Sequence, residues 1–369
     1  MTHTTHSGAQ LRLRPSCTRL LGALLLTGVL GALAPQALAQ GCVAIKQMDG
    51  STVCSLDGHA MTDPTKWSLT VNYQHFRSHR HFVGVAQQFH RNTAGSEVIN
   101  VVEQFDVILT YDLNPQTYLT LDVPYFYASR TSLYEHDRVN RHKTHGKGIG
   151  DLRFGVGHWL RNPQSNPKNN LALGVALKAP TGDSNVKDTF HPAAGPVVRN
   201  VDQSIQPGDG AWGVALSAVA YQRLSDKLAL YATGFYLVNP KETSGTRSNN
   251  AITSPTAYFS VADQYQVRAG ANYLVTPKHV VIASLGLRME GIPSSDLIGG
   301  DKGFRRPGYI VSVEPGISVS PTSRDTFALA VPYALQRNRV RSYVDKINGS
   351  HGDAAFADFT INASYTRRW

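Results

Sequence analysis

Apolar and polar residues alternate along most of this chain with a period of two, which is the pattern of β-strands whose two faces meet different surroundings. Several segments with this pattern exceed ten residues, longer than the five or six of an ordinary globular strand. They reach the length that a tilted strand needs to cross a bilayer. The twelve predicted strands are 66–77, 98–112, 115–128, 149–160, 169–179, 210–223, 227–239, 260–274, 278–290, 307–320, 324–337 and 355–369.

One face of most of these segments is apolar and the other is polar or small. In the second strand Phe105, Val107 and Leu109 alternate with Gln104 and Asp106. A soluble all-β protein and a transmembrane β-barrel can both produce this alternation. No apolar run in the sequence is long enough to predict a transmembrane helix. The longest, near the N-terminus, has fifteen residues, and a membrane-spanning helix needs about twenty.

The connections between the predicted strands alternate in length, and this favours the barrel. Short turns follow the even-numbered strands, for example Leu113-Asn114. Long loops on one side, short turns on the other and an even strand count are typical of outer-membrane proteins. The sequence therefore predicts an all-β, antiparallel up-and-down transmembrane barrel over residues 66–369. The long connections are 78–97, 129–148, 180–209, 240–259, 291–306 and 338–354.

The chain ends on Trp369, directly after an alternating segment. In a barrel the last strand pairs with the first, so that no backbone edge is left in lipid, and an aromatic residue suits the interface. This ending resembles the C-terminal signature of outer-membrane barrels that the barrel-assembly machinery reads, so we expect that machinery as a partner during biogenesis. Arg367 departs from the signature, which has a hydrophobic residue there.

Residues 1–39 have the features of a secretory signal peptide. Arg12, Arg14 and Arg19 precede an apolar run from Leu20 to Ala34, and Ala37-Leu38-Ala39 fits a cleavage site. A membrane anchor is the alternative. Export to the outer membrane of a Gram-negative bacterium is the predicted localisation.

Residues 40–65 form a short segment before the first strand. Cys42 and Cys54 lie in it, and for an exported chain we expect a disulfide rather than a zinc site. The segment is interpreted either as a hatch in the barrel or as a periplasmic tail.

Removal of the signal peptide takes away three arginines and no acidic residue, which lowers the formal charge from +10 to +7. A basic exported chain favours outer-membrane lipid, lipopolysaccharide and a small-molecule solute as partners, and no nucleic acid is expected.

Three stretches carry a family resemblance: GIGDLRFGVGHWL from 148, LALGVALKAPTGD from 171 and a segment that opens GDGAWG at 208. They resemble the outer-membrane proteins of meta-pathway phenol degradation, a family distantly similar to long-chain fatty-acid outer-membrane channels. The resemblance implies passive passage of aromatic or other hydrophobic small molecules. Structural roles for the motifs are favoured over direct solute binding. The matching residues are Gly150, Asp151, Pro180, Thr181, Gly182, Asp183, Gly208, Asp209, Gly210, Trp212 and Gly213.

Charged residues on the predicted inner faces are candidates for the solute path. Because their signs are mixed, they also leave open a narrow, weakly selective channel for small polar or anionic solutes. The predicted lumen residues are Asp106, Asp122, Asp151, Arg153, Lys178, Arg268, Arg288, Glu314 and Asp358.

Histidines gather in and around the first two long loops. His79, His81, His142 and His145 are weak candidates for metal binding, since imidazole binds zinc, copper or nickel. Glu135 and Asp137 are the main carboxylates nearby. The alternative is a basic rim that faces lipopolysaccharide phosphates, and a structural surface barrel also stays open.

Catalytic chemistry is not predicted. The chain has no Gly-x-Ser-x-Gly motif and no evident grouping of nucleophile and base, so neither an enzyme nor a cofactor is expected. A passive channel for small hydrophobic or aromatic molecules is the function that the sequence favours.

Overall fold

The computed structural model describes residues 66–248 and 257–369. The predicted signal peptide, the segment 40–65 and the Cys42–Cys54 disulfide lie outside the described residues. In the part that is described, no helix is both long enough and apolar enough to cross a membrane.

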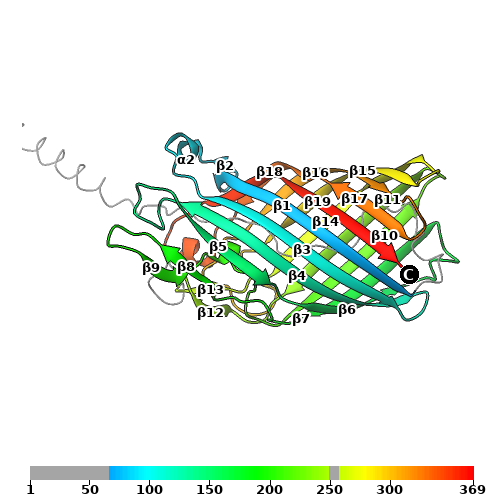
Figure 1. Cartoon of the computed structure of the whole chain (residues 1–369), viewed down its shortest axis with the longest axis horizontal. Helices are drawn as coiled ribbons and strands as arrows, with labels where there is room; N and C mark the ends of the chain where they lie inside the picture. The colour runs from blue at the N-terminus through cyan, green and yellow to red at the C-terminus, as the bar shows by residue number, and fades with distance from the viewer. Residues whose placement is uncertain (1–65, 249–256) are drawn as a thin grey trace, which may run out of the picture. The chain divides into compact units, whose positions relative to one another are not determined.

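The described chain forms a closed antiparallel β-barrel of twelve strands, as the sequence predicted (Figure 1). Each wall strand pairs with its neighbours in chain order, and two of the twelve consist of two pieces. The wall consists of β1 (Trp67–Val83), β3 (Ile99–Asp112), β4 (Thr117–Ser132), β5 (His142–Ile149) with β6 (Arg153–Trp159), β7 (Asn169–Lys178), β10 (Gly213–Arg223), β11 (Leu228–Val238), β14 (Gln264–Thr276), β15 (Val281–Ile292), β16 (Gly308–Val319), β17 (Asp325–Ala330) with β18 (Tyr333–Arg339), and β19 (Ala354–Arg368).

Closure joins the first strand to the last, and Figure 1 shows β1 and β19 side by side. The register runs from Ser68 opposite Arg368 to Phe82 opposite Ala354, with bulges around Ser78. The amide N–H of Trp369 donates to the carbonyl of Trp67 over 3.1 Å. The backbone of the last strand is therefore paired, as the aromatic ending of the chain predicted.

The predicted apolar faces point outward and are exposed. Leu285 and Leu287 on β15 keep 59% and 58% of their surface, while the alternate residues Ser284 and Arg288 are buried on the inner side. A water-soluble protein rarely exposes so many large apolar side chains over one continuous surface. An apolar outer face around a polar interior is the arrangement of a barrel that stands in lipid.

Two wall strands are broken, which corrects their predicted bounds. The strand predicted over 149–160 begins earlier, as β5, and is interrupted at residues 150–152 before β6. Its first half escaped prediction because it has few apolar residues, yet it pairs with β4 throughout. The strand predicted over 324–337 divides into β17 and β18 at Pro332, which has no N–H to donate to the ladder.

Short turns and long loops alternate as predicted, and the long loops contain small elements of their own. The capping box between Ser342 and Asp345 starts one of the short helices. These elements are β2 (Ala86–Gln87), α2 (Phe89–Thr93), β8 (Lys187–Phe190), β9 (Val197–Asn200), the 3-10 helix η3 (Gln203–Ile205), β12 (Thr243–Arg247), β13 (Tyr258–Ser260) and α3 (Tyr343–Ile347).

The loop between β7 and β10, residues 179–212, folds inward at its centre. Val201 and Ile205 are fully buried in one hydrophobic cluster with the inward side chains Phe76, Val102 and Phe126 of β1, β3 and β4. This inward segment, residues 201–207, is held by the barrel wall itself. It brings loop residues into the lumen, where the candidate site lies.

Candidate functional site

Three sequence motifs that lie far apart in the chain meet where β5 ends, β7 ends and β10 begins. The carboxylate of Asp151 accepts the N–H of Gly182 and the N–H of Asp209, each over 3.0 Å. The hydroxyl of Thr181 donates to the carbonyl of Gly150 and accepts the N–H of Leu152, each over 2.9 Å. This motif junction therefore joins the broken strand β5–β6 to the loop that follows β7.

Glycine is required where two of the motifs touch. A Cβ atom on Gly208 would lie 2.2 Å from the carbonyl oxygen of Gly182, and one on Gly182 would lie 2.7 Å from the Cα of Gly208. The two backbones can approach this closely only without side chains. Pro180 and Asp183 flank this contact, and Asp183 accepts the N–H of Asn185 over 2.7 Å in a local turn.

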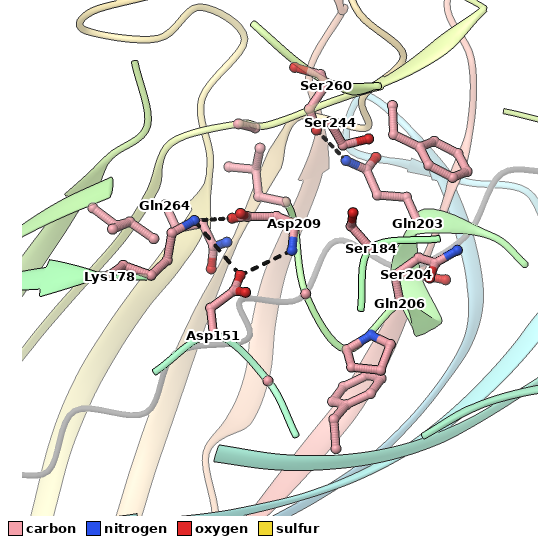
Figure 2. A pocket seen from close by; sticks show the side chains of 18 of the residues that line it. Asp151, Lys178, Ser184, Gln203, Ser204, Gln206, Asp209, Ser244, Ser260 and Gln264 are labelled. Atoms are coloured by element: carbon pink, nitrogen blue, oxygen red, sulfur yellow. Dashed lines mark hydrogen bonds and ion pairs between the residues drawn. The ribbon is translucent and has the colours of Figure 1, made fainter. Parts of the chain in front are cut away.

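Lys178 supplies the positive charge of the motif junction. Its ammonium group is bonded to Asp209 and lies 4.0 Å from Asp151, as Figure 2 shows. Asp209 also caps the next turn by accepting the N–H of Ala211 over 3.1 Å. At Gly210 the backbone has φ +76, a conformation that favours glycine. The polar groups of these motif residues therefore bond to one another and to the backbone.

A cavity of about 100 Å³ lies between the motif junction and the inward segment. One side of it is formed by Gly150, Asp151, Lys178, Gly208 and Asp209 of the junction. Its apolar wall comes from both the barrel and the loops, and consists of Pro124, Phe126, Pro207, Leu237, Phe259 and Ile292.

The cations that line this cavity are paired with acids of the protein. Arg306 binds both carboxylate oxygens of Asp202, and Arg305 donates to Asp296 over 2.7 Å. Burial acts against the charge of Asp202, but Arg130 and Arg306 outweigh it and hold the pKa of this carboxyl well below its ordinary value. The charges therefore hold loops in place.

The amide and hydroxyl groups of the cavity are also used internally. The side chain of Gln206 accepts the N–H of Val186 over 2.8 Å and donates to the carbonyl of Val201 over 3.0 Å. The side chain of Gln203 donates to the carbonyl of Ser260, an interaction visible in Figure 2. Polar atoms of the lining thus mainly fix the inward segment.

The predicted lumen residues fall into three groups. Arg153 donates to Asp122 over 3.0 Å and lies 3.7 Å from Asp106. Asp151 and Lys178 belong to the motif junction described above. On β14, β15 and β16, Arg268 donates to Glu314 over 2.8 Å and Arg288 lies 3.4 Å from the same carboxylate.

Asp358 stands apart from these groups. It accepts a hydrogen bond from Arg337 over 2.7 Å and lies 3.0 Å from Arg80, on the β18–β19 side of the barrel. Eight of the nine predicted lumen residues thus form three charged groups, and the ninth belongs to a local ion cluster.

The histidine candidates do not assemble as a metal site. In the described residues, no group of three or more histidine, cysteine or acidic side chains is placed to hold a metal ion. His81 is a buried core residue that contacts Asp353 over 3.0 Å and accepts the N–H of Val98. His79 and His81 lie on β1 and not in the first loop, and His142 and His145 lie on β5 and not in the second.

His142 instead belongs to a stack of three rings. The ring centroids of His142 and His191 lie 4.4 Å apart, and that of His136 lies 5.0 Å from His142. The stack joins the loop after β4 to the loop after β7. The pairing of His136 with His191 was not foreseen, because the two histidines lie 55 residues apart in the chain.

Sequence patterns missed the loop residues that complete the site. Asp202, Arg305, Arg306 and Ile205 lie in segments without a period-two pattern. The isolated apolar residues of the 179–212 loop were the one available signal, since an exposed loop has little use for them. The pairing of Asp202 with Arg306 depends on the closed barrel, and no sequence pattern near either residue indicates it.

Comparison with known proteins supports the architecture. No family model and no curated protein matches this chain. A solved outer-membrane channel from Pseudomonas putida F1 matches with a TM-score of 0.57 and 17% identity, over 88% of this chain and 100% of that one.

Two further solved structures are less similar. The toluene transporter TbuX of Ralstonia pickettii has a TM-score of 0.42 and 9% identity, over 84% of this chain and 91% of its own. A FadL homologue from Pseudomonas aeruginosa has a TM-score of 0.41 and 9% identity, over 84% and 92%. These two similarities are too weak to carry an argument. The first match supports the fold alone, a closed antiparallel β-barrel, as the sequence predicted.

Proposed function

We propose that this protein is a passive outer-membrane channel for the uptake of small hydrophobic or aromatic molecules. The observation that carries the proposal is the character of the cavity. Its charged side chains are already paired with one another, and the surface that remains for a solute includes aromatic rings, prolines and aliphatic chains. A buried apolar wall favours an apolar solute.

The position in the outer membrane rests on the outer surface of the barrel. Large apolar side chains cover the outside, and the long loops lie together at one end. We infer that this end faces the exterior and that the short turns face the periplasm. The resemblance to the phenol-degradation family supports the same solute class, because its motif residues build one side of the cavity.

The cavity is proposed to pass a solute and not to catalyse a reaction. Covalent catalysis needs a nucleophile beside a base. The described cavity lining includes serines but neither histidine nor cysteine.

The test is solute flux into liposomes that contain the purified full chain. Aromatic hydrocarbons and phenols are compared with sugars and small anions of similar size. We expect faster entry of the aromatic solutes. Uptake graded only by size or charge would instead identify a narrow general channel, the alternative that the mixed lumen charges left open.

A matched pair of variants links the flux to the cavity. Ile292→Asn places an amide in the apolar wall, whereas Ile298→Asn makes the same change at a loop residue that is 58% exposed. We expect aromatic flux to fall several-fold only in the first variant. Equal flux in both variants would show that the aromatic solutes do not pass through this cavity.

A further inference from the structure

The outer face of one wall of the barrel changes from aromatic to basic toward the long-loop end. Tyr73, Phe105 and Tyr125 stand opposite one another on β1, β3 and β4 and form an outward aromatic row. Such a row marks the level of the interface between lipid and water. Beyond it, toward the long loops, the same outward face carries Arg77 on β1 and Lys143 and Lys147 on β5.

These three cations are exposed and have no counter-ion. Among the described residues, the side chains of Arg77, Lys143 and Lys147 form no ion pair or hydrogen bond. Two acids share this surface without contacting the three cations: Glu103 lies 3.8 Å from His75, and Asp188 accepts the N–H of His145 over 2.8 Å. The positive charge of the three long side chains is therefore available to a ligand.

The spacing of the cations fits a large headgroup. Lys143 and Lys147 lie four residues apart on one strand, about 13 Å at the usual rise. In the register of the wall Arg77 is level with His145, between the two lysines, and three strands away, about 14 Å. One inorganic phosphate cannot span three such points. A sugar headgroup with more than one phosphate can.

The described strands β11, β14, β15 and β16 carry an aromatic row of their own. There Tyr236, Tyr265 and Tyr309 follow one another through the ladder, with Gly291 between the last two. These outward positions are uncharged. Arg77 on β1 and Lys143 and Lys147 on β5 thus form a basic wall on the outward face of β1, β3, β4 and β5.

We propose that this basic wall docks the phosphorylated sugar headgroup of one lipopolysaccharide molecule of the outer leaflet, with Arg77, Lys143 and Lys147 as its phosphate contacts. The acyl chains would lie on the apolar outer face below the aromatic row, beside Val107 and Leu121. Basic side chains near a membrane surface attract anionic lipid headgroups in this way. The proposal rests on the outer-membrane position proposed above, but not on the nature of the transported solute.

The test is binding of purified lipopolysaccharide to the full chain in detergent, followed by native mass spectrometry and by the thermal unfolding midpoint. The triple variant Arg77→Gln, Lys143→Gln, Lys147→Gln is compared with Lys168→Gln, Lys227→Gln, Lys278→Gln, which removes three exposed lysines from the short turns. We expect the first triple variant to bind at least tenfold more weakly, and the second to bind like the unchanged chain.

Two further ligands identify the group that is recognised. Dephosphorylated lipopolysaccharide should bind weakly to every variant, and inorganic phosphate should not shift the midpoint. Equal affinity of both triple variants, or undiminished binding of the dephosphorylated lipid, would overturn the proposal. Heat-dependent mobility on gels verifies that each variant is folded. Because no solute is transported in this assay, its failure is distinguishable from failure of the proposed channel function.

Discussion

At the long-loop end a single buried histidine, His136, joins two loops. His136 is 5% exposed, and its Nδ1 accepts the N–H of His191 over 3.0 Å. Its ring also lies 5.3 Å from that of Phe190. Burial first, and then the neighbouring His142 and His191, lower the pKa of His136 from 6.5 to about 4. The neutral ring is therefore the form that the folded loops accommodate.

Acid is expected to loosen this contact. Because the folded pKa is depressed, the stability that His136 contributes is present above pH 6.5 and is lost as the pH falls toward 4. Arg130 disfavours the added charge and Asp137 favours it, and Asp137 stays ionised because backbone and side-chain hydrogen bonds lower its pKa to about 2. Hydrogen exchange of residues 187–200, corrected for intrinsic rates, should be faster at pH 4.5 than at pH 7.5.

The variant His136→Phe is the control for that titration. A phenyl ring can stack on Phe190 but cannot take up a proton. Its exchange rates in residues 187–200 should change little between the two pH values. The same pH dependence in the variant would mean that another group controls the loop.

At the scale of elements, the decisive piece is the inward segment 201–207. It is held by apolar burial of Val201 and Ile205 and by the buried pairs of Asp202 with Arg306 and Arg130. Breaking one partner of a buried charge pair leaves an uncompensated charge, so the element depends on both kinds of contact together.

Ile205→Ala should release this segment. Truncation of a buried isoleucine costs about 2–5 kcal/mol. We expect a larger single-channel ion conductance in planar bilayers, since the segment occupies the lumen. Val198→Ala, at a position of the same loop that is 64% exposed, should leave the conductance unchanged. A conductance of Ile205→Ala equal to that of the unchanged chain would show that the segment does not restrict the pore.

At the scale of the whole molecule, the apolar and polar side chains are distributed as in a membrane protein. Its outward surface is apolar and its polar side chains point inward. The effect of a substitution on stability therefore depends on whether the side chain faces lipid or the lumen. A charge introduced on the outer face near mid-height must be buried in hydrocarbon.

Leu285→Arg should therefore lower the unfolding free energy in lipid vesicles by about 2–4 kcal/mol. Leu285 lies near the middle of β15 and is 59% exposed. Leu297→Arg, at a loop residue that is 69% exposed, serves as the control and should change stability little. Denaturant unfolding followed by tryptophan fluorescence measures both. Equal stability of the two variants would contradict the lipid-facing orientation of β15.

The alternation of side chains by itself determined most of the strands and their two faces, and the alternating lengths of the connections predicted the closed twelve-stranded barrel. Successive side chains of a strand point to opposite faces of the sheet, one toward lipid and the next toward the lumen. The polarity of each residue therefore indicates which face it occupies, without any knowledge of distant contacts. The apolar outward face of β15, with Leu285, was placed correctly on this ground alone. The motif residues were visible in the sequence, but not their contact with one another.

Only the tertiary structure decided which charges pair and where the cavity lies. Asp151 meets the N–H groups of Gly182 and Asp209 because the wall brings three chain segments to one level. The inward turn of residues 201–207 depends on the wall strands β3 and β4, whose side chains Val102 and Phe126 share a hydrophobic cluster with Ile205. Strand β5 escaped prediction because its partner supplies the pairing and its own sequence has no apolar face. Contacts between distant segments arise only when the sheet closes, and the local pattern carries no record of them.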